Sequence, residues 1–482
     1  MTALQDRRCP QDAVAAELEQ LGGRLMMLFA TGTGAAGRLC AITRPGDSIV
    51  SLRAPVSDRT YPAVTPRVPA AHWFEREIHD LWGLVPYGHP RLEPLVVHGP
   101  ERGEIALPAN GDVRAEHRGA ERLSGPGVFV FPYGPVRSGV FEAAQFLVQT
   151  GGEDVAYCAQ RLFFKRRGAE RRVCEVPLEL AVLVAERVSG TSSVAHALAF
   201  SHAVEALSDT EVPARAQAIR RVLAELERLH NHVEVTVREC EDASLSVAQA
   251  QFAALKERLH RLAATIVGHR FLRGAVVPGG IRVDLDAGAA GLIADTLHGW
   301  KRDFSRALAM LLRTDSFLDR LVSAGPLSTD DARDFACVGP VARGSGIDID
   351  TRRDLLYDGY PAFAIARHDD GDAMARMEVR FQEVDTSLVL IAQALGTLAA
   401  GPIRNQPGPL INDAALGAAE SARGETLYWL QAADHDALSF CKLRAASFVN
   451  FGIFNRLFDS QVLTDFSFIE HSLGLSPAGC DA

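Results

Sequence analysis

The sequence predicts an α+β fold: a small N-terminal α+β domain followed by a large, mainly helical bundle domain with small β-sheet caps. Three observations support this prediction. Apolar residues near the N-terminus change between helical and alternating spacing, a stretch with few large apolar residues follows, and long segments with apolar residues at three- and four-residue steps fill most of the remainder. With 482 residues, of which 47% are hydrophobic, the chain is long enough for two or three domains.

The N-terminal domain is expected to cover residues 1–105. Its predicted elements are a helix over Ala13–Leu21, strands over Arg24–Phe29 and Asp47–Leu52, and a short helix that starts near Trp73 and ends at Gly83. Residues 106–126 contain few large apolar side chains and are predicted to form a linker, which places a domain boundary there.

The second domain is expected to cover residues 127–482. Gly127–Phe131 is predicted to be a strand that pairs with Ala144–Gln149, and Gly151-Gly152 is predicted to close a hairpin. Helical spacing then extends over Pro177–Leu207, Pro213–Cys240, Ala248–Phe271, Gly291–Val322 and Met377–Ala399. Several long helices in one domain indicate a helical bundle.

Composition excludes several classes of function. The formal net charge of −10, without a broad basic face, means that nucleic acid is not expected as a partner. The N-terminus lacks an apolar run, and the longest apolar tract, Ser387–Gly401, is broken by Gln393 and Gly396, so neither a signal peptide nor a membrane span is predicted. The eight cysteines lie at least sixteen residues apart, which excludes C-x-x-C zinc and ferredoxin-type motifs and fits a reducing cytoplasm.

Two polar segments have open interpretations from the residues alone. His89 lies in a tight turn within Trp73–Pro94, and a structural role is favoured because it has no evident metal or nucleophile partner. Around Glu170, five cations form either a solvated basic loop or a site for an anion or a partner. These cations are Lys165, Arg166, Arg167, Arg171 and Arg172. Glu142, which precedes the hairpin, is expected to be exposed.

Six segments together carry a resemblance to a known family. Trp73–Pro94, WFEREIHDLWGLVPYGHPRLEP, resembles the signature of the C subunit of NADH:quinone oxidoreductase. The other five resemble, in order, motifs of the D subunit of that complex and of the large subunit of membrane-bound (group 4, formate hydrogenlyase-type) nickel-iron hydrogenases. They are Gly134–Arg172, Pro177–Leu207, Gly339–Tyr360, Gly371–Arg380 and Ala422–Phe448. The chain is thus similar over nearly its whole length to a fused C-like and D-like subunit, which implies a hydrogenase large-subunit-like fold with a docking domain before it.

The cysteine pairs that hold the nickel-iron centre in this family are missing here. Where the hydrogenases have R-x-C-G-x-C, this chain has Ser189 and Ser192, and where D-P-C-x-x-C is expected near the C-terminus it offers only Cys480. A neutral hydroxyl cannot replace a soft thiolate that bridges two metals. We therefore expect a cysteine-less form of the site, with no metal and no hydrogenase activity.

The resemblance also indicates which residues line the vacated cavity. Arg137 stands where the complex I D subunit has a quinone-contacting histidine, and a guanidinium cannot donate a proton near neutral pH. Glu170, in an R-G-x-E element, is either a proton carrier or a counter-ion of the surrounding cations. His196 follows Ser192 by four residues and so shares its helix face, either as a cavity residue or as a core histidine.

Two further candidates come from the segment that begins at Gly339. Arg343 and Asp348 match residues that line the hydrogenase site, although an ion-pair network that holds the loop is an equal alternative. We thus name Glu170, His196, Arg343 and Asp348 as candidate catalytic residues. The candidate acceptor contacts are Arg137, Ser189 and Ser192.

Two functions follow from the resemblance. In the first, the chain is a subunit of a membrane-associated oxidoreductase complex that receives electrons from the iron-sulfur cluster of a partner subunit and uses the cavity for quinone or another small acceptor. In the second, it is a non-catalytic scaffold that links the iron-sulfur subunit to antiporter-like, ion-translocating membrane subunits. In both, the chain binds no cofactor itself and lies on the cytoplasmic side, attached to the inner face of the cell membrane through its partners. NAD binding is implied only by the family resemblance, since no G-x-G-x-x-G motif precedes a predicted helix.

Overall fold

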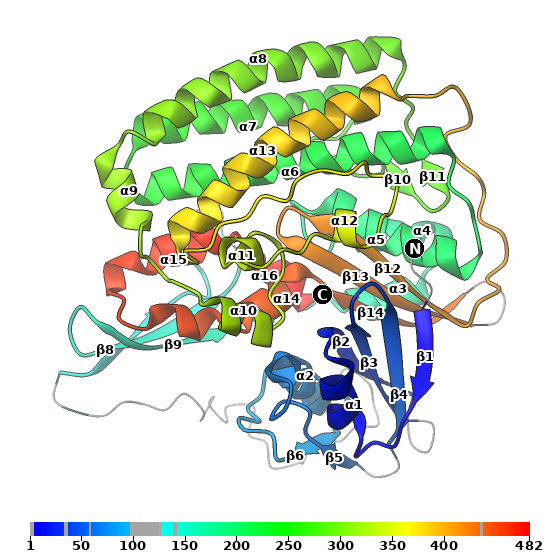
Figure 1. Ribbon diagram of the computed structural model, residues 1–482, viewed down its shortest axis with the longest axis vertical. Helices are drawn as coiled ribbons and strands as arrows, with labels where there is room; N and C mark the ends of the chain where they lie inside the picture. The colour runs from blue at the N-terminus through cyan, green and yellow to red at the C-terminus, as the bar shows by residue number, and fades with distance from the viewer. Residues whose placement is uncertain are drawn as a thin grey trace.

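A β-rich N-terminal region lies below a larger region dominated by four long helices (Figure 1). The computed structural model describes residues 4–32, 37–56, 59–96, 125, 127–137, 142–433 and 437–482. The predicted α+β class, with its β-rich beginning and its helical remainder that carries small sheets, is confirmed. The predicted linker 106–126 lies, apart from Gly125, outside the described residues, and the domain boundaries stay a prediction.

A four-stranded sheet forms the core of the N-terminal region. Its strand order is β1 (Leu4–Arg8), β4 (Ile49–Pro55), β3 (Arg38–Arg44) and β2 (Arg24–Thr31). The pair β1–β4 is parallel and the other two pairs are antiparallel. Every residue of β2 after Arg24 is buried, so this edge strand is covered on both faces, which explains its continuous apolar sequence. The region also contains α1 (Val14–Leu21), η2 (Pro69–Ala71), α2 (His72–Trp82) and the parallel pair β5 (Thr60–Pro62) and β6 (Val85–Tyr87).

Four long helices build the bundle of the second region. They are α6 (Ala214–Asp242), α7 (Ser246–Val267), α8 (Ala287–Leu311) and α13 (Ala373–Gly396). Helix α6 lies between α7 and α13, and its apolar stripe from Ile219 to Val233 is buried. The indole of Trp300 in α8 donates to the carbonyl of Leu255 in α7 at 2.9 Å, so even this large side chain is hydrogen-bonded inside the bundle. The spacing of apolar residues predicts all four of these helices.

Beneath the bundle, helix α5 (Ser193–Leu207) packs on an antiparallel sheet that the sequence did not reveal. The sheet has the order β12 (Ala414–Ser421), β13 (Gly424–Ala432) and β14 (Leu438–Arg444). Helix and sheet approach so closely that a Cβ atom on Gly417 would lie 2.0 Å from the carbonyl oxygen of Ala199 and 2.4 Å from the amide nitrogen of Ala203. Only glycine fits at this contact, and nearly all of α5 is buried as a result.

The remaining elements are short and surround these layers. The predicted hairpin is present as β8 (Gln145–Thr150) and β9 (Val155–Arg161), and β7 (Phe129–Tyr133) pairs with β8 as expected. The others are α3 (Ala169–Glu175), α4 (Leu178–Ala185), β10 (Val276–Val277), β11 (Gly280–Ile281), α9 (Asp315–Leu321), α10 (Thr329–Asp334), α11 (Gly339–Gly344), α12 (Thr351–Asp354), α14 (Ala446–Phe451), η3 (Phe454–Phe458), η4 (Leu463–Asp465), α15 (Phe466–Leu473) and α16 (Pro477–Asp481).

Two predicted helical segments are each divided in the structure. Pro177–Leu207 is two helices, α4 and α5, separated by residues 186–192, where serine, threonine and glycine compete with helical hydrogen bonding. Gly291–Val322 is likewise α8 and α9 with a turn between them, in which the amide of Thr314 donates to the carbonyl of Leu311. The first of these breaks matters most, because it forms one wall of the cavity described below.

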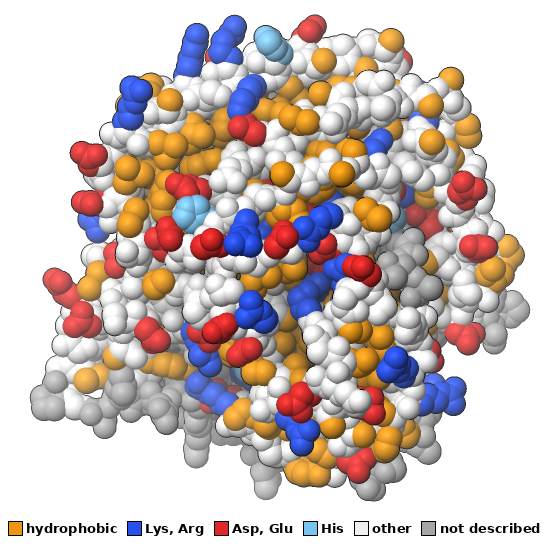
Figure 2. Space-filling model, in the orientation of Figure 1, with side chains coloured by type: hydrophobic (Ala, Val, Ile, Leu, Met, Phe, Trp, Pro, Cys, Tyr) orange, Lys and Arg blue, Asp and Glu red, His pale blue; other side chains and the backbone are white. Residues whose placement is uncertain are grey.

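No helix of the described residues is long and apolar enough to cross a membrane. On the face shown in Figure 2, acidic and basic side chains are interspersed, with apolar side chains between them. The surface there is therefore of mixed charge.

Buried ion pairs join the N-terminal region to the second region. The ammonium of Lys442 in β14 lies 2.7 Å from the carboxylate of Glu77 in α2 and 2.9 Å from that of Glu170 in α3, and all three side chains are at most 15% exposed. Burial favours the neutral form of Lys442, but Glu170 and Glu77 outweigh it and raise the pKa of the ammonium.

A second ionic contact and several aromatic contacts complete this interface. Glu425 of β13 pairs with Arg24 of β2 at 2.8 Å and with Arg444. Burial alone would raise the pKa of Glu425, but Arg24 and Arg444 together lower it to about 2. Phe29 of β2 lies 5.8 Å from Trp429 between ring centroids. The two regions therefore share one continuous core.

We expect Lys442→Met to destabilise the chain by about 3–5 kcal/mol, because it leaves two buried carboxylates without their cation. The free energy of unfolding from urea titration measures this loss. Lys301→Met is the matched control, since Lys301 pairs with Asp385 at the surface and its loss should cost about 0.5 kcal/mol. Equal effects of the two substitutions would contradict the assigned role of Lys442.

Candidate functional site

A small cavity lies where the α4–α5 loop, the β12–β13 turn and the C-terminal segment meet. Its lining residues are Ser189, Ser192, His196, Ser421, Arg423, Thr426, Ala445, Ala446, Ser447, Ser476 and Gly479. The free space at its centre is about 10 Å³, about what the centre of one water molecule requires. The predicted positions Ser189, Ser192 and His196 are thus brought together around one cavity.

The α4–α5 loop is held in place by α6. Helix α5 has no side-chain cap of its own, and the carboxylate of Glu227 in α6 instead accepts hydrogen bonds from the amides of Val194 at 2.6 Å and Ala195 at 3.0 Å. The side-chain amide of Asn231, one turn further along α6, donates to the carbonyl of Thr191 at 2.6 Å. Burial raises the pKa of Glu227 to about 7, against the effect of its two amide donors.

Arg423 reaches across the cavity from the β12–β13 turn. Its guanidinium donates to the hydroxyl of Ser192 at 2.7 Å, to the hydroxyl of Thr191 at 2.9 Å and to the carbonyl of Gly474 at 2.7 Å. Burial lowers the pKa of this guanidinium. The turn itself is fixed by Gly339, which has φ +67° and whose Cβ, if present, would lie 2.1 Å from the carbonyl oxygen of Arg423.

The C-terminal segment closes the opposite wall. The hydroxyls of Ser189 and Ser476 are 3.1 Å apart, and Ser476 also donates to the carboxylate of Glu142 at 2.7 Å. Glu142 accepts a further bond from the amide of Ala478 at 2.7 Å. The prediction of an exposed Glu142 is therefore wrong, because its carboxylate anchors the C-terminal segment.

His196 is a cavity residue and a neutral one. Its Nδ1 atom lies 3.0 Å from the hydroxyl of Tyr428. Burial, together with Arg423 and Arg167, lowers the pKa of the imidazole to about 3. It therefore remains neutral at physiological pH and cannot exchange a proton as an ordinary histidine does.

The residues present do not fit a nickel-iron centre. Ser189 and Ser192 supply neutral hydroxyls, Arg423 brings a cation to the cavity, and Cys480 is buried with a thiol pKa that burial raises well above its usual range. Across the part of the chain that the structure describes, no group of three or more His, Cys, Asp or Glu side chains is placed to hold a metal ion. Only the ligand positions lack cysteine, however; the chain has eight and is not cysteine-less as a whole.

Arg343 belongs to a buried ionic network rather than to the cavity. Its guanidinium lies 2.6 Å from Glu383 of α13, 2.9 Å from Glu420 of β12 and 3.4 Å from Asp350, with every one of these side chains at most 2% exposed. Arg352 continues the network by pairing with Asp350 at 2.7 Å. Of the two predicted roles for Arg343, the observed geometry therefore matches the ion-pair network that holds the loop.

Three other predicted site residues also lie away from the cavity. Asp348 is at the surface, 3.0 Å from Arg353, with a side chain 55% exposed. Arg137 is buried and pairs with Glu470 at 2.6 Å. Glu170 forms the Lys442 contact at the junction of the two regions.

The sequence did not single out Arg423 or Ser476. Glu227, by contrast, begins the E-R-x-x-N-H element at Glu227–His232, from which the family resemblance predicts a structural polar network under the cavity. Arg423 had one available signal, its place in the sequence Ala422-Arg423-Gly424 between two apolar runs, which is typical of a tight turn. Ser476 had none, because it reaches the cavity from an element distant in sequence. Its role is visible only in three dimensions.

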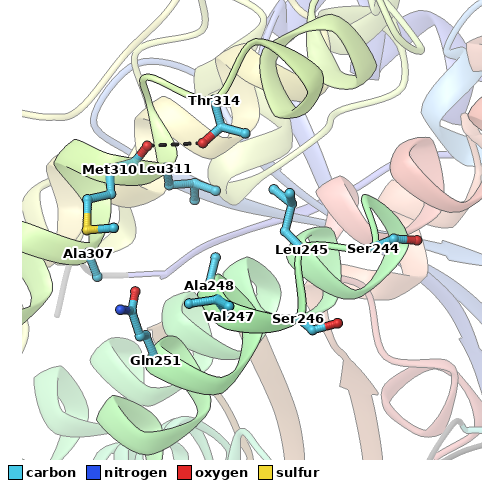
Figure 3. Close-up of a pocket in the computed structure, with 10 residues that line it drawn as sticks. All are labelled: Ser244, Leu245, Ser246, Val247, Ala248, Gln251, Ala307, Met310, Leu311 and Thr314. Atoms are coloured by element: carbon cyan, nitrogen blue, oxygen red, sulfur yellow. Dashed lines mark hydrogen bonds between the residues drawn. The ribbon is translucent and has the colours of Figure 1, made fainter.

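A wider groove of about 430 Å³ lies at one end of the bundle, between the α6–α7 turn and the end of α8 (Figure 3). The apolar side chains of Leu245, Val247, Met310 and Leu311 contribute to its walls. None of the residues that line it is ionisable, so the groove offers no acid, base or charged ligand.

Comparison with known proteins shows that the chain is similar to subunits of NADH dehydrogenase, formate hydrogenlyase and hydrogenase-4. Residues 244–413 match the family of the respiratory-chain NADH dehydrogenase 49 Kd subunit, and residues 35–112 match the family of the 30 Kd subunit. Formate hydrogenlyase subunit 5 of Escherichia coli is 31% identical over 428 residues, which cover 86% of this chain and 75% of that protein. Hydrogenase-4 component G of the same organism is 28% identical, over 88% of this chain and 76% of that protein. The C/D subunit of the NADH-quinone oxidoreductase of Acinetobacter baylyi is 26% identical, over 76% of this chain and 66% of that protein.

The raised pKa of Glu227 predicts a specific pH dependence of stability. Between about pH 4.5 and 7 the native state keeps a proton that the unfolded chain has released, so stability from this group is present at the lower pH and is lost as pH rises towards 7. Glu227→Gln should remove that slope. We expect the difference in unfolding free energy between wild type and variant to change by about 3 kcal/mol across this interval.

The exposed Glu179→Gln is the control for this experiment and should leave the pH profile unchanged. Parallel profiles for wild type and Glu227→Gln would show that the carboxyl is not buried as described.

Proposed function

The chain belongs to the family of formate hydrogenlyase subunit 5 and the C/D subunit of NADH-quinone oxidoreductase. Within this family, we propose that it is a non-catalytic coupling subunit of its complex. It is a subunit of a multi-subunit oxidoreductase of the complex I and group 4 hydrogenase type, with a 30 kDa-like part fused to a 49 kDa-like part. In the proposed role its former metal cavity is a structural centre, and electrons pass through partner subunits.

The size of the cavity carries this proposal. A space of about 10 Å³ is far below the roughly 300–1,000 Å³ of sites that bind organic ligands. Arg423 and Ser192 are joined across it, and Ser189 and Ser476 are within hydrogen-bond distance of each other. A quinone ring could enter only after these contacts had separated.

The chemistry of the lining supports the same conclusion. His196 has a pKa of about 3 and Arg423 keeps its charge, so neither is suited to deliver protons to a reduced acceptor. Glu170, the remaining acid of the family's R-G-x-E element, is engaged with Lys442 at the domain junction. These groups stabilise the fold, and none of the described residues that line the cavity is an aspartate or glutamate that could donate a proton.

The partners we propose are an iron-sulfur small subunit and antiporter-like membrane subunits, on the cytoplasmic face of the membrane. Support comes from the family and from the lack, in the sequence, of a C-x-x-C cluster motif. The shared core of the two regions suits a scaffold, since a displacement at the N-terminal region is transmitted through Lys442 and Glu425 to the sheet below α5.

Acceptor binding is the second candidate. It is favoured by one observation: His196 and Arg423 both line the cavity and could donate hydrogen bonds to a carbonyl oxygen. The first candidate is preferred because the space between these side chains is so small.

We expect the purified complex to contain much less than one nickel per chain, because no thiolate pair is present at the site. Elemental analysis of the complex measures this directly. Stoichiometric nickel that co-purifies with this chain would overturn the argument from Ser189 and Ser192.

We expect His196→Gln to leave quinone or dye reduction by the assembled complex within about twofold of wild type, since the imidazole has no catalytic task in a scaffold. The protein composition of the complex and its turnover are measured on the same preparation. Glu170→Gln is the contrasting variant, which should weaken assembly by disturbing the Lys442 contact. A loss of about tenfold or more in a fully assembled His196→Gln complex would support acceptor binding instead.

A further inference from the structure

We propose that the cavity binds one small monatomic anion of chloride or bromide size, held by Arg423, His196 and the hydroxyls of Ser192 and Ser447. The inference deepens the proposed function and rests on it in one respect, namely that the cavity has a structural role. Its basis is the balance of hydrogen-bond donors and acceptors around the cavity.

Arg423 is the positive charge of this site. Among the described residues it has no carboxylate at ion-pair distance, and its three hydrogen bonds go to two hydroxyls and one carbonyl. Glu142, Glu227 and Glu234 act on its charge only from farther away. A guanidinium has five N–H groups, so two of them remain for a ligand in the cavity.

His196 adds a third donor. Tyr428 is buried and its hydroxyl has His196 Nδ1 as its hydrogen-bond partner in the structure. The phenol must therefore donate to Nδ1, because its hydrogen would otherwise be buried without an acceptor. A neutral imidazole then carries its own hydrogen on Nε2, and His196 lines the cavity.

Two hydroxyls complete the set. The oxygen of Ser192 accepts from Arg423 at 2.7 Å, and the oxygen of Ser447 accepts from the amide of Ser476 at 3.0 Å. Each oxygen is thus engaged as an acceptor, while its hydrogen is left to donate. The nearby carboxylate of Glu142 is held by Ser476 and the amide of Ala478.

A cavity with this lining selects for an anion over water. A water molecule brings two hydrogens of its own into a space already surrounded by donors, whereas a halide only accepts. The volume of about 10 Å³ admits one atom and excludes sulfate or a carboxylate. A halide would also supply one of the two negative charges that thiolates at positions 189 and 192 would carry.

The test compares thermal unfolding of the full chain in sodium chloride, bromide, sulfate and gluconate at one ionic strength of about 0.1 M. At about a hundred times its Kd, a halide should raise Tm by about 2–3 °C for a chain of this size. Ser192→Asp is the key variant. It places a carboxylate beside Arg423 and should abolish the difference between halide and gluconate while far-UV circular dichroism stays native.

Ser305→Asp adds the same charge on the exposed face of α8 and should keep the halide response. Crystals grown in bromide should show an anomalous peak at hydrogen-bond distance from Arg423. The proposal is overturned by equal salt responses in wild type and Ser192→Asp, or by a bromide-free cavity that holds only water. Both results leave nickel content and turnover untouched, so failure of the anion site is distinguishable from failure of the scaffold role.

Discussion

The buried ionic network around Arg343 is the constraint on which the second region depends. Buried charged side chains require oppositely charged partners, because an unpaired buried charge reduces the free energy of unfolding by several kcal/mol. Arg343 of α11 meets this requirement only if α13, β12 and the segment before α12 stand around it with Glu383, Glu420 and Asp350. Helix α11 with the segment that follows it, helix α13 and strand β12 are thereby fixed relative to one another. One of them, β12, leads into the turn that carries Arg423.

The second constraint is the core shared between the two regions. Residues 35–112 and 244–413 of this chain match two separate family models, those of the 30 Kd and the 49 Kd subunit. The contact between the two regions has the character of a protein interior, with a buried lysine between two carboxylates and aromatic rings from both sides in contact. Motion of one region relative to the other would separate the lysine from a carboxylate and leave these charges without their partners. Buried ion pairs and aromatic contacts therefore hold the two regions together.

In the proposed role, the cavity keeps the loops that surround the family's metal site but lacks the thiolates that would bind the metal. Glu227 and Asn231 still hold the α4–α5 loop, and Gly339 still allows the β12–β13 turn to approach. At the centre, however, serine hydroxyls and a guanidinium have closed the space by hydrogen bonding to each other. Neutral hydroxyls and a guanidinium do not suit a metal cation, and the hydrogen-bond donors among them fit the anion that we propose.

The sequence by itself determined the α+β class, the long helices and the missing thiolates, because each follows from the local spacing of apolar residues or from the identity of a residue. It could not reveal the sheet β12–β14, whose first strand, AALGAAES, is rich in alanine and becomes a strand only because α5 packs on it at Gly417. Nor could it separate candidate residues that look alike: Ser192 and His196 line the cavity, whereas Glu170, Arg343 and Asp348 are engaged elsewhere. Tertiary structure decided these points, since the partner of a charged side chain is set by which elements meet in space, and Arg423 and Ser476 meet Ser192 and His196 at the cavity from distant parts of the chain.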